Sequence, residues 1–191
     1  MTPEKRYIAD MHLGHENIIR FCGRPFVSAA EMNRVVLENY NQVVQDEDTV
    51  YLLGDIFFRC CKPNEEAQLL ARMKGKKVLL LGNHDSSWIH KVDLSLYFEQ
   101  VVEDKLEIMD RNRRVTLCHY PLLDEIYTRD GGYMVHGHIH NNGPNMLEWP
   151  QLYRAECLLN ASVEVVGYQP CTLDELIHRN AAFKAMHPCR P

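Results

Sequence analysis

The sequence lacks a long apolar run, an excess of basic residues and a paired-cysteine motif, and each absence excludes a class of protein. The longest unbroken aliphatic run, Val78 to Leu81, has four residues, whereas a membrane-spanning helix needs about 20. The first residues lead into no apolar stretch of signal-peptide length, so we expect a cytoplasmic protein that does not contact a membrane. The net charge of −5 argues against binding of an extended nucleic acid, which normally requires a basic excess.

The seven cysteines form no C-x-x-C pair, and their number is odd. A chain of 191 residues buries roughly 70% of its unfolded surface and needs no disulfide framework, so a reducing compartment fits best. No repeat, low-complexity tract or linker divides the chain, and 46% hydrophobic residues exclude a disordered protein. We therefore expect one domain over residues 1–191, and no pattern indicates an oligomeric state.

What the sequence has in excess is histidine. Ten histidines are roughly twice the usual share for a chain of this length. Imidazole binds transition metals and exchanges protons near neutral pH, so the positions of these residues indicate where function is to be sought.

Short β-rich or aliphatic segments predict buried strands, and each runs into Gly, Asp, Asn or His. They are Arg6 to Asp10, Thr49 to Leu53, Lys77 to Leu81, Val115 to Cys118 and Tyr133 to His136. The segment Asn160 to Glu164 predicts a late strand beside them. Strands that alternate with helices early and pair with one another late favour a layered α/β fold with at least one mixed sheet. In such folds the ligand site lies beyond the carboxyl ends of the strands.

Helical patterns separate these strands. Capping boxes at Ser28–Glu31 and Thr172–Glu175 predict the first turns of two helices, the second of which runs towards Lys184. The segment Pro63 to Met73 predicts another helix, and Asp110 to Arg113 predicts the tip of a β-hairpin.

Polar residues of one kind follow the predicted strands. Asp10 and His12 follow the first strand and share a face, because side chains alternate in an extended chain. The later clusters are Gly54-Asp55, Gly82-Asn83-His84-Asp85, His119 and Gly137-His138-x-His140. A Gly-Asp pair is common at any turn, but the ordered set is far more specific, because a structural core has no use for so many buried carboxylates and imidazoles. Three clusters begin with glycine, whose missing side chain lets backbone and ions approach closely.

In this order the five blocks resemble the motifs of the calcineurin-like metallophosphoesterases, and the small size is similar to that of compact bacterial and phage members. The resemblance implies a four-layer α-β-β-α sandwich of two mixed sheets flanked by helices, with two metal ions at the strand ends. It implies that one ion is held by Asp10, His12, Asp55 and His140. The second ion would share Asp55 and be held also by Asn83, His119 and His138.

Oxygen and imidazole ligands without cysteine suit divalent Mn, Fe, Zn or Ni, among which we expect Mn. Two such ions outweigh the charges of Asp10, Asp55 and a bridging hydroxide, so the site attracts a phosphate ester despite the acidic chain. The expected reaction is hydrolysis of a small phosphomonoester or phosphodiester by in-line attack of the metal-bridging hydroxide. The alternatives are a metal-dependent nuclease acting on short oligonucleotides and a non-catalytic binding or scaffold protein that retains the fold.

His84 has the role of general acid in the family pattern, and imidazole titrates near neutral pH, as protonation of a leaving oxygen requires. The alternative is that His84 is an eighth ligand. Its neighbour Asp85 would fix the tautomer of His84 and raise its proton affinity.

Three further residues are candidate substrate contacts. His15 could touch the phosphate or the leaving group, or instead begin a helix or support a ligand. Arg24, on an expected surface loop, and Arg59 could each clamp a phosphate oxygen as a bidentate donor, or form a surface ion pair. His136 shares the face of His138, but a strand histidine with satisfied hydrogen bonds is the simpler interpretation.

Overall fold

The computed structural model describes residues 2–58, 64–124, 128–141 and 150–187. Its strands form two four-stranded sheets, in the orders β1-β2-β3-β4 and β5-β6-β7-β8. The first sheet contains β1 (Lys5–Ile8), β2 (Thr49–Leu52), β3 (Lys76–Leu80) and β4 (Gln100–Val102). The second contains β5 (Lys105–Asp110), β6 (Arg113–Cys118), β7 (Tyr133–His136) and β8 (Leu158–Asn160). The five buried strands predicted up to His136 are confirmed, each with ends within two residues of the prediction.

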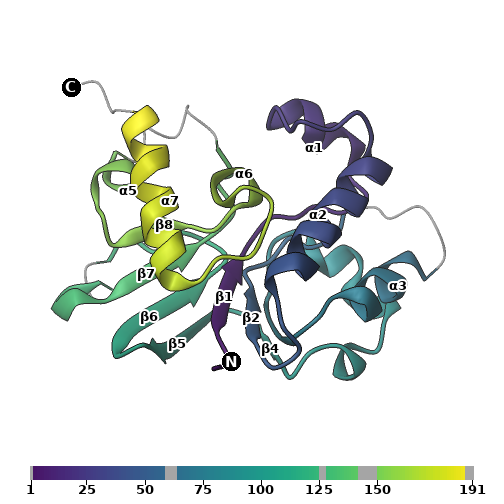
Figure 1. Cartoon of the computed structure of the whole chain (residues 1–191), viewed down its shortest axis with the longest axis horizontal. Helices are drawn as coiled ribbons and strands as arrows, with labels where there is room; N and C mark the ends of the chain where they lie inside the picture. Colours follow the sequence, from purple (N-terminus) through teal and green to yellow (C-terminus); the bar gives the residue numbers. More distant parts are fainter. Residues whose placement is uncertain (1, 59–63, 125–127, 142–149, 188–191) are drawn as a thin grey trace.

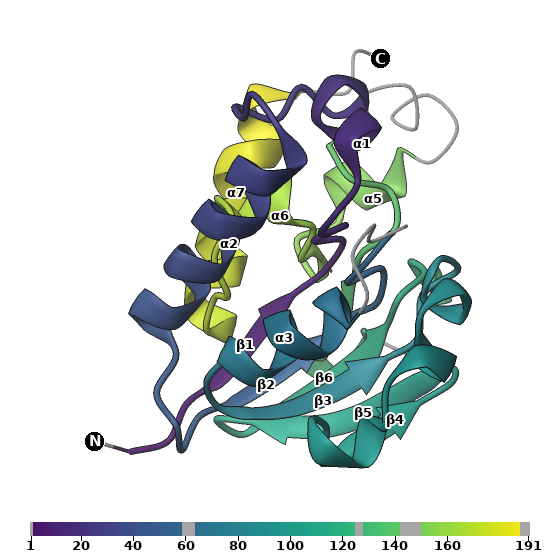
Figure 2. The ribbon, with the colours of Figure 1, turned by 90° about the vertical axis from the view of Figure 1, so that its right-hand side faces the viewer.

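Helices flank the two sheets. They are α1 (Glu16–Phe21), α2 (Ala29–Val43), α3 (Glu65–Arg72), α5 (Gln151–Arg154), α6 (Val163–Val166) and α7 (Leu173–Met186). Figure 1 shows α7 beside β7 and β8 in one half of the molecule, and α2 and α3 beside the first sheet in the other. Figure 2 shows α2 and α7 on one side of the molecule and β4 and β5 on the opposite side. An α/β fold of two sheets flanked by helices is thereby confirmed.

The two sheets differ in how their strands pair. The strands of the first sheet pair only in parallel, and its antiparallel pairing among the described residues is confined to a single bridge between Tyr7 and Cys171. In the second sheet β5 pairs antiparallel with β6, while β6 with β7 and β7 with β8 are parallel. The resemblance implied two mixed sheets, but only the second has this character. Crossover connections join β1 to β2, β2 to β3 and β3 to β4, and such connections place successive strands in parallel.

The predicted hairpin between β5 and β6 is confirmed. Asp110 pairs with Arg113, so only Arg111 and Asn112 form the loop. Both residues have positive φ, +46° and +64°, the backbone of the two-residue turn whose twist matches that of antiparallel strands.

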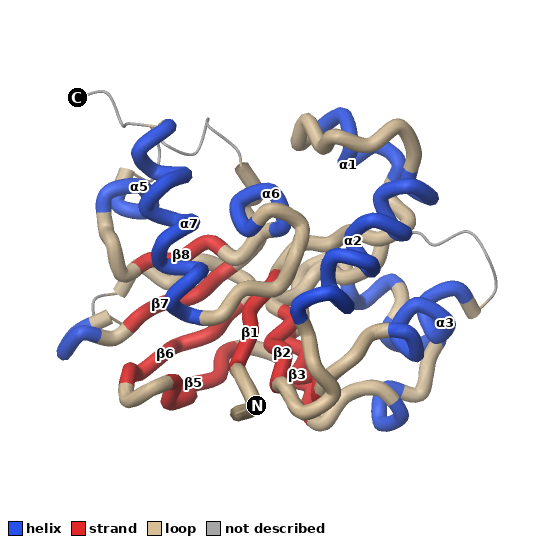
Figure 3. The backbone as a smooth tube through the Cα atoms, in the orientation of Figure 1, coloured by secondary structure: helices blue, strands red, loops and turns tan. Residues whose placement is uncertain are grey.

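One hydrophobic core joins the two sheets. Buried residues of β2, β6 and β7, among them Leu52, Leu117 and Val135, belong to the same cluster. Beyond the end of β1, Ala9 bridges Ser162 in parallel, so the chain after β8 lies beside the chain after β1. In Figure 3 β1 accordingly lies between the remaining strands of the two sheets. This arrangement brings strand ends from both sheets to one place.

The helix starts follow the predicted capping patterns in part. The box at Thr172 is complete, whereas at Ser28 only one of the two bonds forms. The Ser28 hydroxyl accepts from the Glu31 N–H at 3.2 Å, but the Glu31 carboxylate reaches one residue further back and accepts from the Val27 N–H at 2.7 Å. Helix α3 begins at Glu65, and the start predicted at residue 63 lies outside the described residues. Within the described part of the chain, no helix has the length and apolar content needed to cross a bilayer.

Candidate metal centre

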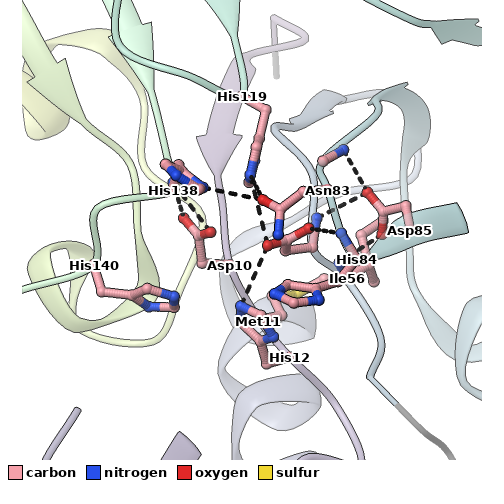
Figure 4. A network of polar contacts seen from close by, with 12 residues as sticks. Asp10, Met11, His12, Ile56, Asn83, His84, Asp85, His119, His138 and His140 are labelled. Atoms are coloured by element: carbon pink, nitrogen blue, oxygen red, sulfur yellow. Dashed lines mark hydrogen bonds and ion pairs between the residues drawn. The ribbon is translucent and has the colours of Figure 1, made fainter. Parts of the chain in front are cut away.

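The seven candidate ligands lie together where strands of the two sheets end: Figure 4 labels six of them, and the seventh, Asp55, lies 3.6 Å from both His12 and His119. Asp10 and His12 follow β1, Asp55 follows β2, Asn83 follows β3, His119 follows β6, and His138 and His140 follow β7. Because β1, β2 and β3 are parallel, as are β6 and β7, their carboxyl ends meet at common edges of the sheets. Parallel pairing is therefore what gathers residues that are up to 130 positions apart in the sequence.

The backbone at these residues is unusual. Ten described residues other than glycine have positive φ, and five of the ten are candidate ligands. Their φ values are +57° at Asp10, +49° at His12, +55° at Asp55, +70° at His138 and +49° at His140. Each such residue costs of the order of 1–3 kcal/mol, and such strain persists where the surrounding structure requires it, chiefly at functional sites. Half of the described non-glycine residues with positive φ therefore lie in one cluster.

Asp55 lies between two imidazoles that come from different sheets. Its Oδ2 atom is 3.6 Å from Nε2 of His12 and 3.6 Å from Nε2 of His119. The Asn83 Oδ1 atom is 3.0 Å from Nε2 of His119 and 3.0 Å from Nδ1 of His138. The Asp55 carboxylate therefore has His12 on one side and, on the other, His119, which in turn contacts Asn83.

The hydrogen bonds of two histidine rings, those of His119 and His12, indicate whether the site suits a cation. His119 Nδ1 lies 2.8 Å from the carbonyl oxygen of Leu53, which assigns the N–H to Nδ1 and leaves the lone pair of Nε2 directed into the centre. His12 is 2% exposed, and neither of its ring nitrogens has a hydrogen-bond partner. Burial lowers the pKa of His12 far below its usual range, so the ring is neutral and offers an unused lone pair. Buried nitrogen lone pairs facing carboxylates fit a divalent cation.

Asp10 is fully buried, and burial raises the pKa of its carboxyl. Its Oδ2 atom accepts from the Ser162 hydroxyl at 2.8 Å and from the His138 N–H at 2.9 Å. The carboxylate lies within 4.8 Å of ligand atoms in two sets, one formed with His12 and His140 and the other with Asp55 and His119. The donors are thus carboxylate, carboxamide and imidazole, a set that suits transition metals such as Mn, Fe, Zn or Ni.

The glycines that precede the polar residues make room for the carboxylates. A Cβ atom on Gly82 would overlap the Asp55 carboxylate, and one on Gly137 would overlap the Asp10 carboxylate. A Cβ atom on Gly54, where φ is +82°, would lie 2.6 Å from Nδ1 of His119. The sequence predicts close approach of backbone and ions at these glycines, and in the structure the groups that approach are the side chains of candidate ligands.

His84 lies beside the centre, and Asp85 has a different position from the one that the sequence suggests. The His84 ring is half-buried, with its centroid 5.4 Å from that of His12 and 4.9 Å from that of Phe58. The Asp85 carboxylate accepts four hydrogen bonds, from the N–H groups of Asp55, Ile56 and Gly82 and from the Trp88 indole. The prediction that Asp85 orients the His84 ring is therefore not supported, because both carboxylate oxygens already accept from other groups: Oδ2 from Asp55 and Gly82, and Oδ1 from Ile56 and Trp88.

The candidate substrate contacts have separate outcomes. His15 is half-buried at the start of α1, with its ring 4.0 Å from Phe58 and 5.6 Å from His12, so it lies beside the centre and also begins a helix. The prediction that Arg24 clamps a phosphate at the surface is wrong, because its side chain is fully buried and all its donors are directed at protein atoms. Arg59 lies outside the described residues. His136 is buried, and its Nδ1 contacts the Gly137 carbonyl oxygen at 3.0 Å, as a strand histidine with a satisfied bond would.

The segment 160–164 contributes two contacts to the site, from Ser162 and Glu164, that the sequence did not predict. Strand β8 ends at Asn160 and α6 begins at Val163, so the predicted late strand is wrong beyond Asn160. This change from strand to helix directs Ser162 at Asp10 and places Glu164 against His140, with 3.2 Å between Glu164 Oε1 and His140 Nδ1. Burial alone would lower the pKa of His140, but hydrogen bonds with Cys22 and Glu164 and the charge of Asp10 raise it to about 11. The available signal was that two polar residues, Ser162 and Glu164, follow a strand within an otherwise apolar segment.

Fold and site together define an α/β protein with a cluster of histidine, aspartate and asparagine side chains at the ends of its strands. Residues 7–177 match the calcineurin-like phosphoesterase family, and the chain belongs to this family. Members of this family generally bind divalent metals and hydrolyse phosphoesters, so this chain is assigned to the metal-dependent hydrolases.

Several known proteins are similar to this chain. An uncharacterized protein of Methanocaldococcus jannaschii is 34% identical over 180 residues, covering 93% of this chain and 92% of that protein. The Gene 66 protein of Mycobacterium phage L5 is 26% identical over 160 residues, covering 71% of this chain and 76% of its own. The crystal structure of a protein of unknown function from Aquifex aeolicus superposes with a TM-score of 0.69 at 29% identity, covering 91% of this chain and 97% of that one. The archaeal protein and the Aquifex structure thus match more than 90% of this chain, and the phage protein matches 71% of it.

Proposed function

We propose that this protein is a dinuclear metal-dependent phosphoesterase that hydrolyses a small phosphomonoester or phosphodiester. The observation that carries the proposal is the position of Asp55, whose Oδ2 lies 3.6 Å from Nε2 of both His12 and His119. A single carboxylate between imidazoles from two sheets suits two divalent ions that share one ligand. Membership of the calcineurin-like phosphoesterase family supports the hydrolytic reaction.

The proposed ligands divide into two sets that share Asp55. The first set is Asp10, His12, Asp55 and His140, and the second is Asp55, Asn83, His119 and His138. Two divalent ions, when bound, lower the pKa of a water molecule and stabilise the charge that develops on the phosphoryl oxygens. Among the metals that the donors suit, we propose Mn, with Fe, Zn and Ni as alternatives.

His84 is the proposed general acid. Its backbone N–H donates to Asp55 Oδ1 at 2.8 Å, which fixes the peptide against the metal centre while the half-buried ring stays accessible to a substrate. Imidazole can donate a proton to the leaving oxygen near neutral pH. Phosphoryl transfer depends mainly on positioning and electrostatics, so the chain need not supply a covalent nucleophile.

The first experiment measures metal content and hydrolysis together. Protein stripped with a chelator is reconstituted with Mn²⁺, and bound metal is counted before p-nitrophenyl phosphate, bis-p-nitrophenyl phosphate and short oligonucleotides are assayed. The proposal predicts two ions per chain and hydrolysis of at least one small ester. Turnover of oligonucleotides alone would instead favour the nuclease alternative. Fewer than two ions per chain together with no hydrolysis would refute the enzyme assignment.

Replacing His84 separates acid catalysis from metal binding. His84→Ala should retain both ions and lower kcat by about 10²–10⁴ on alkyl esters, because proton transfer from a positioned acid contributes that much. The loss should be smaller on p-nitrophenyl esters, whose leaving group departs without a proton. The matched control is His178→Ala, since His178 is exposed on α7 and should leave metal content and kcat unchanged. Loss of an ion in His84→Ala would show that His84 is a ligand.

A further inference from the structure

Glu164 on α6 is buried against the metal centre without belonging to any family block identified in the sequence. Its side chain is 3% exposed, and its Oε1 and Oε2 atoms lie 3.2 Å and 3.4 Å from Nδ1 of His140. A carboxylate accepts hydrogen bonds and cannot donate them, so the proton between these groups is on Nδ1 of His140. The other ring nitrogen, Nε2, is then the one available to a cation.

Arg24 connects Glu164 to the loop that carries two further ligands. Its Nε and Nη2 atoms lie 2.8 Å and 2.7 Å from Glu164 Oε1, and its guanidinium is fully buried. The same guanidinium donates from Nη1 to the carbonyl oxygen of Met11 at 2.7 Å and from Nη2 to that of Asp10 at 2.8 Å. Because Asp10 and His12 flank Met11, one side chain ties the first ligand loop to the carboxylate that touches His140.

The burial of this pair is informative. Removing two charges from water is costly, and a buried ion pair stabilises a fold no better than well-packed apolar residues do. Here the arginine uses its fixed fork of donors to fill several acceptors at once, a task that a point charge could not perform. The pair therefore has a geometric consequence, namely that Asp10, His12 and His140 are held in one arrangement.

We propose that Arg24 and Glu164 form a buried positioning pair that fixes the tautomer of His140 and thereby sets the affinity of the metal position formed by Asp10, His12 and His140. The inference rests on the proposed function only in requiring that a divalent ion binds there. Histidine ligands are commonly held by a carboxylate on the second ring nitrogen, and loss of such a partner lowers metal affinity by about 10–100-fold.

Glu164→Gln tests the tautomer directly. The amide keeps the size of the side chain, and its oxygen can still accept from Arg24, which turns the NH2 group towards His140 Nδ1. The Gln oxygen in the place of Oε1 still lies 3.2 Å from Nδ1, but the NH2 group in the place of Oε2, 3.4 Å away, sets its hydrogens against the ring N–H. Opposed N–H groups disfavour the tautomer that leaves Nε2 free for a cation. The same exchange of carboxylate for carboxamide beside a histidine gives the wrong tautomer in serine proteases.

The measurement is a calorimetric titration of metal-free protein with Zn²⁺ alone. We expect Glu164→Gln to bind one of the two ions about 10–100-fold more weakly, and Glu164→Asp, which keeps the carboxylate, to recover part of that loss. Thermal unfolding of the metal-free variants is measured in parallel. An unchanged Zn²⁺ affinity in Glu164→Gln would overturn the proposal, and a lowered melting temperature alongside it would show that the pair only stabilises the fold.

A second measurement does not depend on any variant folding. In the Zn²⁺ complex of the wild-type protein, ¹⁵N chemical shifts should show Nδ1 of His140 protonated and Nε2 bound to the metal. The reverse assignment would overturn the proposal. If the wild type binds no Zn²⁺ at all, the metal centre itself is refuted, whereas normal binding with the reverse tautomer refutes only the role of Glu164.

Cys22 is a second group in contact with His140, because its sulfur lies within 4.8 Å of the ligand atoms of His140 and Glu164. With Glu164 in place, the proposal predicts a smaller loss of Zn²⁺ affinity in Cys22→Ala than in Glu164→Gln. A loss in Cys22→Ala equal to that in Glu164→Gln would show that these three residues bind an ion themselves, and would overturn the positioning role.

Discussion

Replacing Asp85 by Ala distinguishes a residue that supports the site from one that takes part in the chemistry. Four N–H groups would lose their acceptor, those of Asp55, Ile56, Gly82 and the Trp88 indole, at 2.7–3.1 Å from the carboxylate. Asp85 is fully buried and Trp88 is 1% exposed, so water does not readily replace the lost acceptor. Each buried donor left without a partner costs about 1–3 kcal/mol. Because the four donors share one acceptor group, the losses are not additive, and we expect about 3–5 kcal/mol in total.

The assay is urea unfolding of the metal-free protein, followed by circular dichroism. Asp85→Asn is the matched variant, because it keeps one oxygen as an acceptor and should lose roughly half as much stability. Both variants should also bind Mn²⁺ more weakly, since the same N–H groups position Asp55 and Gly82. If Asp85→Ala unfolds at the wild-type urea concentration but loses kcat, the structural reasoning is refuted and a direct action on His84 is favoured.

Three further predictions concern the glycine cradle, the bound metal and alkaline stability. Gly82→Ala should lose at least one bound ion, counted by elemental analysis of folded protein, because a Cβ atom there would overlap the Asp55 carboxylate. Saturation with Mn²⁺ at 100 times its dissociation constant should raise the free energy of unfolding by about 2.7 kcal/mol per site, and chelation should reverse this; no shift would contradict the metal centre. Burial and the hydrogen bond to Asp110 raise the pKa of Tyr7, so neutral Tyr7 stabilises the fold fully below about pH 10, and this contribution falls as the pH rises further. Tyr7→Phe should remove about 1 kcal/mol of that fall between pH 10 and 11, where the phenol of the unfolded chain is only partly ionised, as measured by urea unfolding; an identical slope would contradict the assignment.

Local patterns in the sequence predicted the elements of the fold well where short-range chemistry determines them. The two-residue hairpin at Arg111 and Asn112 and the capping box at Thr172 depend on neighbours within a few positions. The segment after Asn160 was harder, because its apolar residues fit a strand and a helix equally well. Contact with the end of β1, seen in the bridge from Ala9 to Ser162, decides where the strand stops.

The candidate site likewise has a part that the sequence predicted and a part that it did not. The resemblance implied the seven candidate ligands, and the structure gathers all of them at the strand ends. Arg24 and Glu164 are 140 positions apart and belong to no short motif, so their pairing could not be inferred from spacing. The position of Asp85 was misjudged for a related reason, since adjacency to His84 in the chain does not decide which way a buried carboxylate faces.

The sequence by itself determined which chemistry is available: imidazoles and carboxylates at the ends of buried strands, with glycines before them where a Cβ atom could not fit. Composition and periodicity are local properties, and they suffice for that much. Only the tertiary structure decided how these groups are held, with Asp55 between two histidines, Asp85 bound to the backbone, and Arg24 and Glu164 buried behind His140. Those contacts join distant segments, and their geometry follows from the packing of two sheets around one core.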